Sequence, residues 1–358
     1  MEQTMKAAVL YAREDLRYED VPMPQIQKPD EIKIRVISAG ICGSDVPRVL
    51  GDTSWVYPIV LGHECFGEIV ETGSAVTDLK VGDKIIVAPD IPCFECDDCQ
   101  NGYYGSCRNY DFIGTKRQGG FAEYLVIDRK NAVWLDPGTT YHEAMMFEPA
   151  TVGCHAMRRA AFRGGSVTAI IGCGTVGIFA VQWARAFGAR KVVAFDVVPE
   201  RLELAKRMGA DAVVNSADPD WLDQAMALTD NQGFEYVFEV AGQPATMKMS
   251  YYLVRTRGII CMIGYPGVPV TFEAPDVFEM IRKEFSVMGS RMSFSPPFPG
   301  PDWTLTGEYF AKGLLKCDPS MIDREFPLSE ANAAFDLFRT PGQVKGKVLL
   351  LNPYYFKI

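Results

Sequence analysis

The stretch VTAIIGCGTVGIFAVQWARAFG, residues 167–188, decides the fold of this chain. An apolar run, Val167–Ile171, is typical of a buried strand, and the helical segment Thr175–Phe187 follows it and ends at Gly188. The turn between them has the spacing Gly-x-Gly-x-x-Gly, with glycines at Gly172, Gly174 and Gly177. Glycines so placed allow a tight turn, a close approach of the backbone to a pyrophosphate and close packing of helix on strand. The stretch therefore predicts a dinucleotide-binding unit.

The strand that follows this unit ends at Asp196, 19 residues after Gly177. Its carboxylate can accept hydrogen bonds from both hydroxyls of an adenosine ribose and would repel a 2′-phosphate, so we expect NAD rather than NADP. Arg201, five residues further on, weakens this preference because an Arg can bind that phosphate. A plain strand–helix turn with a surface Asp is the alternative. The expected cofactor-binding residues are Gly172, Gly174, Thr175, Val176, Gly177, Asp196 and Arg201.

Strands and helices alternate from about residue 153 to residue 290. The six apolar runs predicted as strands are Val167–Ile171, Val192–Phe195, Ala212–Val214, Tyr236–Val240, Ile259–Ile263 and Phe285–Met288. Helical segments lie between several of them. One of these, Pro199–Met208, has Pro at its first turn and Gly209 just past its end. Six strands with crossover helices predict an α/β fold with a doubly wound parallel sheet.

The first 150 residues have a different pattern, in which short Val and Ile runs are broken by Gly, Pro and Asp. Examples are EIKIRVISAG (31–40), FGEIVETG (66–73) and DKIIVAP (83–89). Such runs predict an all-β domain that is barrel-like.

The tail has a mixed pattern. A Pro-rich loop, PPFPGPDW (296–303), is followed by the predicted helices Trp303–Leu315 and Leu328–Phe338. The last apolar run, Lys347–Leu351, is a predicted strand that could return to the first domain. We therefore expect a first domain over 1–152, a nucleotide-binding domain over 153–290 and a returning segment over 291–358.

Composition limits the classes of function. The chain has 358 residues, 48% apolar and 23% charged, which is ordinary for two globular domains. Its net charge is −9 and it has no long basic run, so we expect neither nucleic acid nor a membrane surface as a partner. The uncharged stretch 164–184 contains five glycines, which fits a buried strand, turn and helix better than a membrane span. We expect a cytoplasmic protein, since charges interrupt the N-terminus where a signal peptide needs an apolar core.

Four of the ten cysteines crowd into fifteen residues, as Cys93, Cys96, Cys99 and Cys107. Four thiolates at this spacing can close a tetrahedral zinc site, and in a chain without an export signal we expect a metal rather than disulfides. An iron–sulfur cluster is the alternative metal site. Ferredoxin-type runs, however, usually place the fourth Cys three residues on and before a proline, whereas here it is eight residues on and precedes Arg108. Four unliganded thiols are the remaining alternative.

A second set of possible metal ligands is spread along the chain. Cys42 can supply sulfur, His63 nitrogen, and Glu64 or Glu148 oxygen to a zinc ion that keeps one position open for water or substrate. Each residue also has an ordinary explanation, because a lone Cys is usually an apolar filler and a lone His a hydrogen-bonded structural residue. The other two histidines, His142 and His155, lie in a predicted helix and are taken as structural.

Taken together, these motifs resemble the zinc-containing medium-chain dehydrogenase family. The stretches that carry the resemblance, in the family's order, are GHE (62–64), the four-cysteine lobe, GGFAEY (119–124), EPATVGCHA (148–156), GCGTVG (172–177) and GKVLL (346–350). The resemblance covers essentially the whole chain. It implies a GroES-like β-barrel catalytic domain with an inserted Rossmann domain, and a structural zinc lobe at about 90–110.

The resemblance also implies residue roles. Cys42, His63 and Glu148 would hold a catalytic zinc, with Glu64 as an alternate ligand, and the four lobe cysteines would hold a second zinc ion. Ser44 would relay the proton of the alcohol. Many relatives place a His five residues after the ligand Cys to end this relay; here that residue is Pro47, so the relay must end elsewhere, for example at water.

Within the family, the chain is most similar to polyol and sugar-phosphate dehydrogenases of the galactitol 1-phosphate type. The stretches that carry this likeness are CGSDVPR (42–48), YDFIGTKRQGGFAEY (110–124) and SRMSFSPPFPGPDW (290–303). It implies hydride transfer between a secondary alcohol of a polyol phosphate and NAD, in a homodimer or homotetramer. Arg48, Lys116 and Arg117 could bind the phosphate, or could be solvated surface charges. An unphosphorylated polyol or 2,3-diol dehydrogenase, and a redox-inactive crystallin-like binding protein, are the alternatives.

Overall fold

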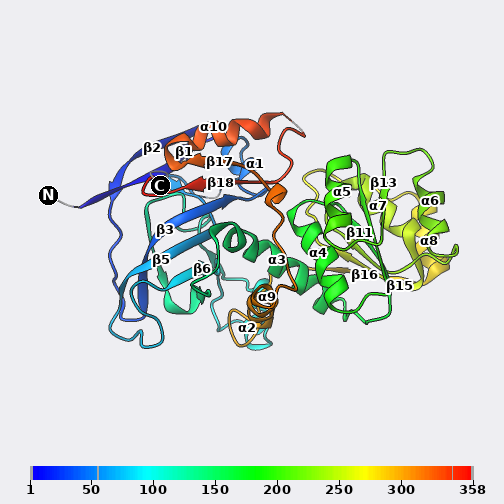
Figure 1. Ribbon diagram of the computed structural model, residues 1–358, viewed down its shortest axis with the longest axis horizontal. Helices are drawn as coiled ribbons and strands as arrows, with labels where there is room; N and C mark the ends of the chain where they lie inside the picture. The colour runs from blue at the N-terminus through cyan, green and yellow to red at the C-terminus, as the bar shows by residue number, and fades with distance from the viewer. Residues whose placement is uncertain (1–2, 55, 341, 356–358) are drawn as a thin grey trace. The chain divides into compact units, whose positions relative to one another are not determined.

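Two units divide the chain in a computed structural model that describes residues 3–54, 56–340 and 342–355 (Figure 1). Unit 1 comprises Met1–Glu148, Phe294–Gly307 and Cys317–Ile358, and unit 2 comprises Pro149–Ser293 and Glu308–Lys316. The divisions differ by a few residues from the domain limits expected above, and residues 308–316 group with unit 2 rather than with the returning segment. The reason is local: the helices α3 (Tyr141–Arg159) and α9 (Pro301–Ala311) are continuous across two of the divisions.

Unit 1 is built from antiparallel strands, as the short Val and Ile runs predict. A three-stranded sheet has the order β2-β1-β4, formed by Asp15–Pro22, Thr4–Ala12 and Ile59–Val60. A seven-stranded sheet has the order β10-β6-β5-β3-β18-β17, with β9 also pairing β3. Its strands are β3 (Glu31–Ile41), β5 (Glu64–Thr72), β6 (Lys84–Val87), β9 (Tyr124–Asp128), β10 (Ala132–Trp134), β17 (Ile322–Pro327) and β18 (Lys347–Leu351).

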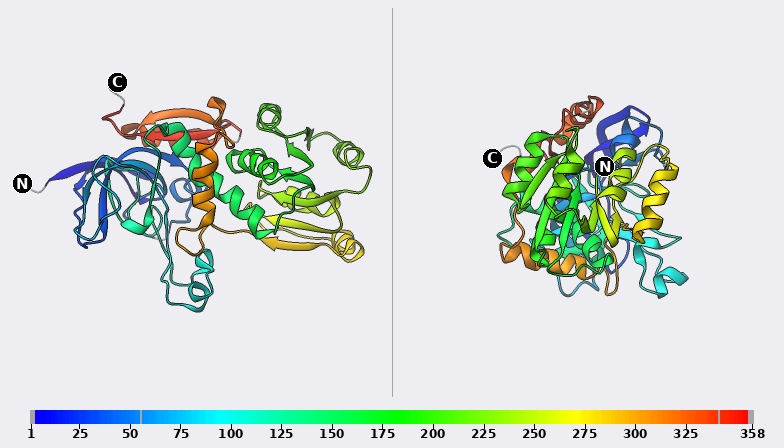
Figure 2. Two further views of the ribbon diagram at one scale, coloured as in Figure 1. Left: turned by 60° about the horizontal axis from the view of Figure 1, so that its bottom comes forward. Right: turned by 90° about the vertical axis from the view of Figure 1, so that its right-hand side faces the viewer.

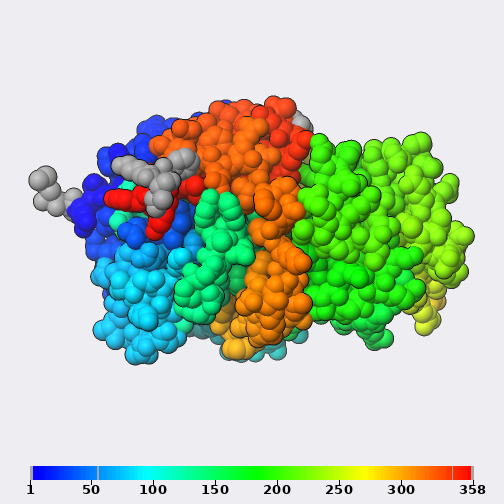
Figure 3. Space-filling model, viewed as in Figure 1, coloured from blue at the N-terminus to red at the C-terminus, as the bar shows by residue number. Residues whose placement is uncertain are grey.

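The predicted C-terminal strand lies beside the N-terminal part of this sheet. β18 pairs antiparallel with β3, with Leu350 opposite Ala39. All five residues of β18 are buried. Blue N-terminal and orange and red C-terminal surfaces of unit 1 accordingly lie side by side in Figure 3. The core of this unit includes Leu10, Ile32, Ile34 and Phe121, none of which is exposed.

Short elements complete unit 1. β7 (Asp90–Ile91) and β8 (Asp111–Phe112) form a two-stranded ladder on either side of the four-cysteine segment. The short helices are α1 (Val46–Val49), α2 (Asp97–Gln100), η1 (Tyr104–Ser106), η2 (Arg129–Asn131), η3 (Pro319–Met321), η4 (Leu328–Glu330), α10 (Ala331–Asp336) and η5 (Leu337–Arg339). The predicted helix Leu328–Phe338 is thus a six-residue α-helix, α10, between two 3₁₀ turns.

Unit 2 confirms the predicted doubly wound parallel sheet. Its six strands have the order β13-β12-β11-β14-β15-β16, and all five ladders are parallel. Helices cover both faces of the sheet (Figure 2). The strands are β11 (Val167–Ile171), β12 (Lys191–Asp196), β13 (Ala212–Asn215), β14 (Phe234–Glu239), β15 (Val254–Met262) and β16 (Ser286–Gly289). The helices are α4 (Thr175–Ala186), α5 (Pro199–Arg207), α6 (Trp221–Ala227), α7 (Pro244–Leu253) and α8 (Ala274–Lys283).

Helix ends are where the sequence pattern was least accurate. α9 begins at Pro301, two residues before the predicted start, because proline is well suited to a first helical turn. It ends at Ala311 rather than Leu315, and Gly313 shortly after has a left-handed φ of 66°. Within the described residues, no helix combines the length and the apolar character needed to span a membrane.

Candidate functional site

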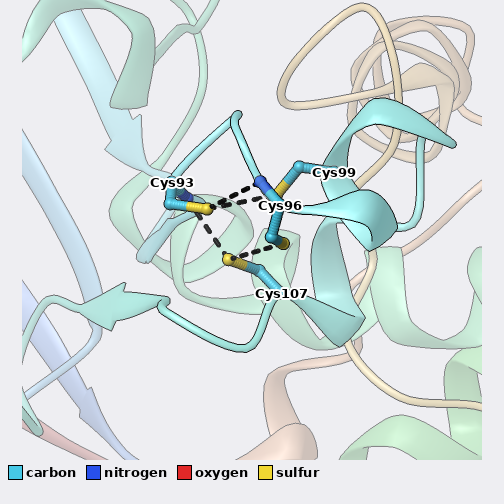
Figure 4. Close-up of side chains that lie close together, drawn as sticks. All are labelled: Cys93, Cys96, Cys99 and Cys107. Atoms are coloured by element: carbon cyan, nitrogen blue, oxygen red, sulfur yellow. Dashed lines mark hydrogen bonds between the residues drawn. The ribbon is translucent and has the colours of Figure 1, made fainter.

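The four lobe cysteines converge on one point in unit 1 (Figure 4). Their Sγ atoms all lie within 4.8 Å of one another, and the Cys93–Cys99 and Cys96–Cys107 sulfur pairs are each 3.9 Å apart. Zinc–sulfur bonds of about 2.3 Å in a tetrahedron place two sulfurs about 3.8 Å apart. The lobe geometry therefore fits a four-thiolate zinc ion.

Backbone groups of the lobe stabilise two of these sulfurs as thiolates. The N–H groups of Cys99 and Arg108 lower the pKa of Cys96 to about 6, and those of Glu95 and Cys96 lower the pKa of Cys93. Burial raises the pKa of the other two sulfurs, Cys99 and Cys107. Burial therefore disfavours two of the thiolates until a cation is present.

A second cluster forms where β3 ends and β5 begins. The antiparallel register places Gly40 opposite Glu64, so that Cys42, just after β3, comes close to His63, just before β5. The donor atoms of Cys42, His63 and Glu64 lie within 4.8 Å of one another. A Cβ at Gly40 would lie 2.3 Å from Oε2 of Glu64, so a larger residue there would displace the Glu64 carboxylate. The sheet register thus brings together three residues that the sequence pattern groups as possible ligands of one zinc ion.

Asp45 supports two members of this cluster, although the sequence reasoning gave it no role. It is fully buried, and its Oδ2 accepts a hydrogen bond from the Cys42 N–H at 3.0 Å. Its Oδ1 lies 3.4 Å from Nδ1 of His63. A carboxylate that fixes the ring of a histidine is the usual second partner of a metal-bound imidazole. The signal available was the CGSD motif itself, in which Asp45 follows the candidate ligand by three residues.

Lys347 is the other residue that sequence reasoning missed. It opens β18, is 7% exposed, and its Nζ lies 2.7 Å and 2.6 Å from the two carboxylate oxygens of Glu64. Burial alone would lower the pKa of Lys347, but the interactions with Glu64, Cys42 and Glu148 together outweigh burial and raise it. The signal was a lysine at the head of the apolar run Lys347–Leu351. An ammonium group already neutralises Glu64 in this arrangement.

Glu148 is not in the tight group of three, but it lies within electrostatic range of it. It lies on α3, and burial together with the charge of Glu64 raises the pKa of its carboxyl to about 7. The negative charge of the cluster also acts on a buried histidine. Burial would lower the pKa of His63, yet Asp45 and Cys42 raise it well above the usual value. Such surroundings favour a cation at this place.

Ser44 and Arg48 lie next to the cluster, and the backbone of Lys116 and Arg117 is linked to it through Phe112. Ser44 Oγ donates to Cys42 Sγ at 3.4 Å, and Arg48 Nη1 donates to the Ser44 carbonyl. The ring of Phe112 packs edge-on against His63 with centroids 5.6 Å apart, and the amides of Lys116 and Arg117 donate to the Phe112 carbonyl.

Lys116 and Arg117 already have partners within the protein. Nζ of Lys116 donates to the Tyr110 carbonyl at 2.8 Å and lies 3.6 Å from the centroid of the Tyr110 ring. Arg117 Nε donates to Asp111 at 2.6 Å. These contacts hold both side chains against the segment that follows the cysteine lobe.

The glycine-rich turn lies in unit 2, between β11 and α4. Gly172 has a φ of 96°, and a Cβ at Gly177 would lie 1.8 Å from the Gly172 carbonyl oxygen, so both positions require glycine. A Cβ at Gly174 would meet nothing within 4 Å. Because Gly174 is also the N-cap of α4, the backbone there is open to an anion at the helix N-terminus.

Asp196 ends β12 beside this turn. Its Oδ2 accepts from the Cys173 N–H at 2.7 Å, and its Oδ1 accepts from Val197 and Val198 at 2.8 Å and 2.9 Å. The side chain is therefore fixed in position by the backbone. Thr175 and Val176 form the first turn of α4, and Arg201 lies in the first half of α5.

Two family models match the chain. Residues 28–137 match an alcohol dehydrogenase GroES-like domain, and residues 175–304 match a zinc-binding dehydrogenase. Galactitol 1-phosphate 5-dehydrogenase of Escherichia coli K12 is 35% identical over 347 residues, which is 97% of this chain and all of that protein. Sorbitol dehydrogenase of Bacillus subtilis is 38% identical over 271 residues, which is 74% of this chain and 76% of that one.

Solved structures give the same result. The structure of galactitol-1-phosphate dehydrogenase from Escherichia coli has a TM-score of 0.90 at 35% identity, covering 97% of this chain and 100% of that chain. A zinc-binding dehydrogenase of Sinorhizobium meliloti bound to NADP (31% identity; 98% and 100% covered) and an alcohol dehydrogenase of Escherichia coli CFT073 complexed with NADH (27%; 97% and 99% covered) both have TM-scores of 0.87. The expected GroES-like and Rossmann parts are confirmed.

Proposed function

The chain belongs to the zinc-binding alcohol dehydrogenase family with a GroES-like domain, and on this premise we propose that it transfers a hydride between a secondary alcohol of a polyol phosphate and NAD, giving the ketose phosphate. The observation that carries the proposal is the convergence of Cys42, His63 and Glu64 within 4.8 Å. A redox-inactive binding protein would have no need of a thiol, an imidazole and a carboxylate at such a point.

Zinc would be held by Cys42, His63 and Glu148, with Glu64 as alternate ligand, and the lobe cysteines would hold the second ion. When bound, a catalytic zinc supplies Lewis acidity that lowers the pKa of an alcohol. Asp45 orients the His63 ring, and Lys347 holds the Glu64 carboxylate. Ser44 is exposed, so its Oγ can pass the alcohol proton to water, since Pro47 offers no acceptor for a longer relay.

The cofactor would bind to unit 2 by its pyrophosphate at the Gly172–Gly177 turn, where the N-terminus of α4 is free of side-chain capping bonds. Thr175 and Val176 would contribute backbone amides. Asp196 is fixed beside the turn and would accept from the ribose hydroxyls, which favours NAD. Arg201 is the residue through which a 2′-phosphate could still be accepted, and similar structures hold NADP in one case and NADH in another.

The phosphate group on the substrate is the most specific part of the proposal. It is supported by 35% identity to a galactitol 1-phosphate enzyme along nearly the full chain, and by the cations Arg48, Lys116 and Arg117 near the cluster. Two observations favour an unphosphorylated polyol instead. Lys116 and Arg117 are already engaged by Tyr110 and Asp111, and the chain is also 38% identical to a sorbitol dehydrogenase over part of its length.

The test is kcat/KM for the matched pair galactitol and galactitol 1-phosphate, each with NAD and with NADP. We expect the phosphorylated substrate and NAD to be preferred, and Asp196→Ala to relax the choice of cofactor. If kcat/KM is higher for free galactitol, the proposed polyol-phosphate activity is wrong and the alternative, an unphosphorylated polyol dehydrogenase, takes its place. Equal kcat/KM with both cofactors would remove the role given to Asp196.

We also propose that the enzyme is a homodimer or homotetramer. β16 is an edge strand of the unit 2 sheet, and apolar side chains on it and on α8 are exposed: Phe278 60%, Ile281 66% and Val287 42%. An edge strand and an apolar surface of this kind are normally covered. Sedimentation analysis of the purified protein should show an oligomer, and of Ile281→Glu a smaller species; a monomeric parent would refute the proposal.

A further inference from the structure

A row of aromatic rings runs through unit 1 from the cysteine lobe to helix α3. Its six residues, called the aromatic row below, are Phe94, Tyr104, Phe298, Phe294, Trp303 and Phe147. Successive ring centroids are 5.2 Å apart for Phe94–Tyr104, 5.7 Å for Phe94–Phe298, 5.7 Å for Phe298–Phe294, 5.5 Å for Phe294–Trp303 and 5.9 Å for Trp303–Phe147. Every spacing lies in the range in which aromatic rings attract one another.

One end of the row belongs to the lobe. Phe94 lies between Cys93 and Cys96 in the sequence, and Tyr104 precedes Cys107 by three residues. A third contact comes from Gly102 of the lobe, where a Cβ would lie 3.0 Å from the ring of Pro296. The thiolates that close the lobe therefore also set the position of the surface against which Phe298 packs.

The middle of the row is a tight loop. The Ser295 N–H donates to the Pro299 carbonyl at 3.1 Å, and Gly300 completes the turn with a φ of 119°. Phe294 enters this loop and Phe298 lies within it, so the loop holds the two stacked rings against each other. Phe294 is 4% exposed and Trp303 is fully buried, which leaves no room for either ring to take another position.

The far end of the row holds the turn of α3 that carries Glu148. Phe147 is 2% exposed, stacks on Trp303, and lies so close to α9 that a Cβ at Gly307 would be 3.6 Å from its ring. Pro149 lies inside α3 and has no N–H to donate to the Met145 carbonyl, so the helix loses one of its own hydrogen bonds at this turn. Packing of Phe147 therefore helps to fix the rotation of the helix that determines where Glu148 lies.

We propose that the aromatic row makes the cysteine lobe a positioning element for Glu148. The lobe fixes Phe298, the stacked rings transmit that position to Phe147, and Phe147 sets the direction of the neighbouring carboxylate toward the Cys42–His63 cluster. The inference rests on the proposed function, which makes Glu148 a ligand of the catalytic zinc. The row residues are positioning residues, because their effect on the metal passes through Glu148.

The contrasting explanation is that the rings are ordinary packing. Loss of packing lowers the melting temperature but leaves the affinity of a distant metal site unchanged. A positioning role changes how tightly the catalytic metal is held, and does so even where the melting temperature is unaffected. The affinity of each metal site therefore separates the two explanations.

The experiment compares Phe298→Leu with Phe338→Leu in the metal-replete full chain. Phe338 is a matched control, because it is also half-buried in unit 1 and contacts one buried ring, Phe335 at 6.4 Å, outside the row. Chelator competition measures release of both metals, and Cys42→Ala identifies the release phase of the catalytic site. Tyr104→Leu is a second row variant for the case that Phe298→Leu does not fold, and Phe298→Tyr restores the ring.

We expect Phe298→Leu to speed release of the catalytic metal and to lower kcat/KM by roughly threefold to tenfold each, the scale of one aromatic pair. Lobe metal should be retained, Phe338→Leu should change both quantities less than about twofold, and Phe298→Tyr should recover the parent values. The inference is overturned if Phe298→Leu and Tyr104→Leu behave as Phe338→Leu does. It is also overturned if they lose only the lobe metal.

The same measurements separate failure of this inference from failure of the proposed function. If the parent protein holds a single metal ion, or if Cys42→Ala still holds two, the assignment of the catalytic zinc is wrong whatever the row variants do. If the parent holds two ions and Cys42→Ala loses one, an unchanged release rate in the row variants refutes the positioning role alone.

Discussion

The two cysteine-containing clusters of unit 1 differ in how the chain assembles them. In the lobe all four donors come from residues 93–107, and the backbone N–H groups that stabilise two of its thiolates come from residues 95–108. In the other cluster the donors come from the end of β3 and the start of β5, and their supports Asp45 and Lys347 come from α1's N-cap and from β18. A local site can form wherever its segment folds, whereas the second site exists only when the sheet has its register.

The clusters also differ in their donor atoms and in the charge of those donors. The lobe offers four sulfurs, which satisfy a tetrahedral ion completely and leave no position for a substrate. The Cys42–His63–Glu64 cluster offers unlike donors, and one of them, Glu64, is already neutralised by Lys347. An ion held there would keep an open position. On the proposed function, the first cluster would provide stability and the second would carry the chemistry, and each prediction below tests that division.

The largest effect should follow removal of a donor from the second cluster. We expect Cys42→Ala and His63→Ala to lower kcat by at least about a thousandfold, because the Lewis acid that they would hold would supply several kcal/mol in the transition state. Melting temperature should change little. Turnover with alcohol and NAD, metal content and thermal unfolding are measured together. If a variant lost its fold along with its activity, the second cluster would be needed for stability as well, which would contradict the division.

Removal of a lobe donor should have the opposite signature. We expect Cys96→Ala to lose one metal ion and to melt roughly 4 °C lower, the shift produced by a loss of about 3 kcal/mol in a protein of this size. Turnover should survive, reduced by no more than about tenfold through the aromatic row. The division of roles would be wrong if Cys96→Ala abolished turnover while its melting temperature stayed at the parent value.

The sequence predicted each cluster to the extent that its assembly is local. The spacing of Cys93, Cys96, Cys99 and Cys107 along the chain determines the geometry of the lobe directly. The spacing of the glycines determines the geometry of the nucleotide-binding turn in the same way. Asp45 and Lys347 could not be given roles, because their partners are set by strand register. Charged residues next to a candidate ligand, or at the head of an apolar strand, were the only signals.

The aromatic row was beyond sequence reasoning for the same reason. The stretch 290–303 resembles sugar-phosphate enzymes, but nothing in its sequence indicates that Phe298 contacts the lobe and that Phe294 contacts Trp303. Aromatic contacts between distant segments depend on packing. The fold of unit 2, by contrast, follows from runs and turns that are read along the chain, and there all six predicted strands are present.

A smaller effect should come from the support of the second cluster. Asp45→Asn keeps the size of the side chain but removes the charge that faces His63 at 3.4 Å. We expect catalytic-metal affinity and kcat/KM to fall about tenfold to a hundredfold, the usual range for the second partner of a metal-bound histidine. Lobe metal should be unaffected. Asp98→Asn, a carboxylate of the lobe paired with the exposed Arg108, is the control and should change neither quantity. Equal effects of the two substitutions would contradict the assignment.

The smallest effect concerns the three cations, which divide between the same two regions. Arg48 bonds to the Ser44 carbonyl, next to the Cys42 sulfur, whereas Lys116 and Arg117 follow the lobe and are held by Tyr110 and Asp111. If the second cluster is where chemistry occurs, Arg48 is the better placed to meet a substrate phosphate. We expect Arg48→Ala to lower kcat/KM for galactitol 1-phosphate about tenfold, the cost of one charged hydrogen bond, with little change for free galactitol.

The double variant Lys116→Ala/Arg117→Ala should instead change kcat/KM for both substrates by the same factor. Its cations serve the segment around Phe112, whose ring packs on His63, and this contact is the same whichever substrate is bound. The ratio of kcat/KM between the matched substrates is therefore the quantity to compare, because it cancels any general loss of activity. If the double variant narrows this ratio and Arg48→Ala does not, the phosphate is bound from the lobe side. The lobe would then have a part in substrate recognition, and the division between a stabilising and a chemical cluster would have to be redrawn.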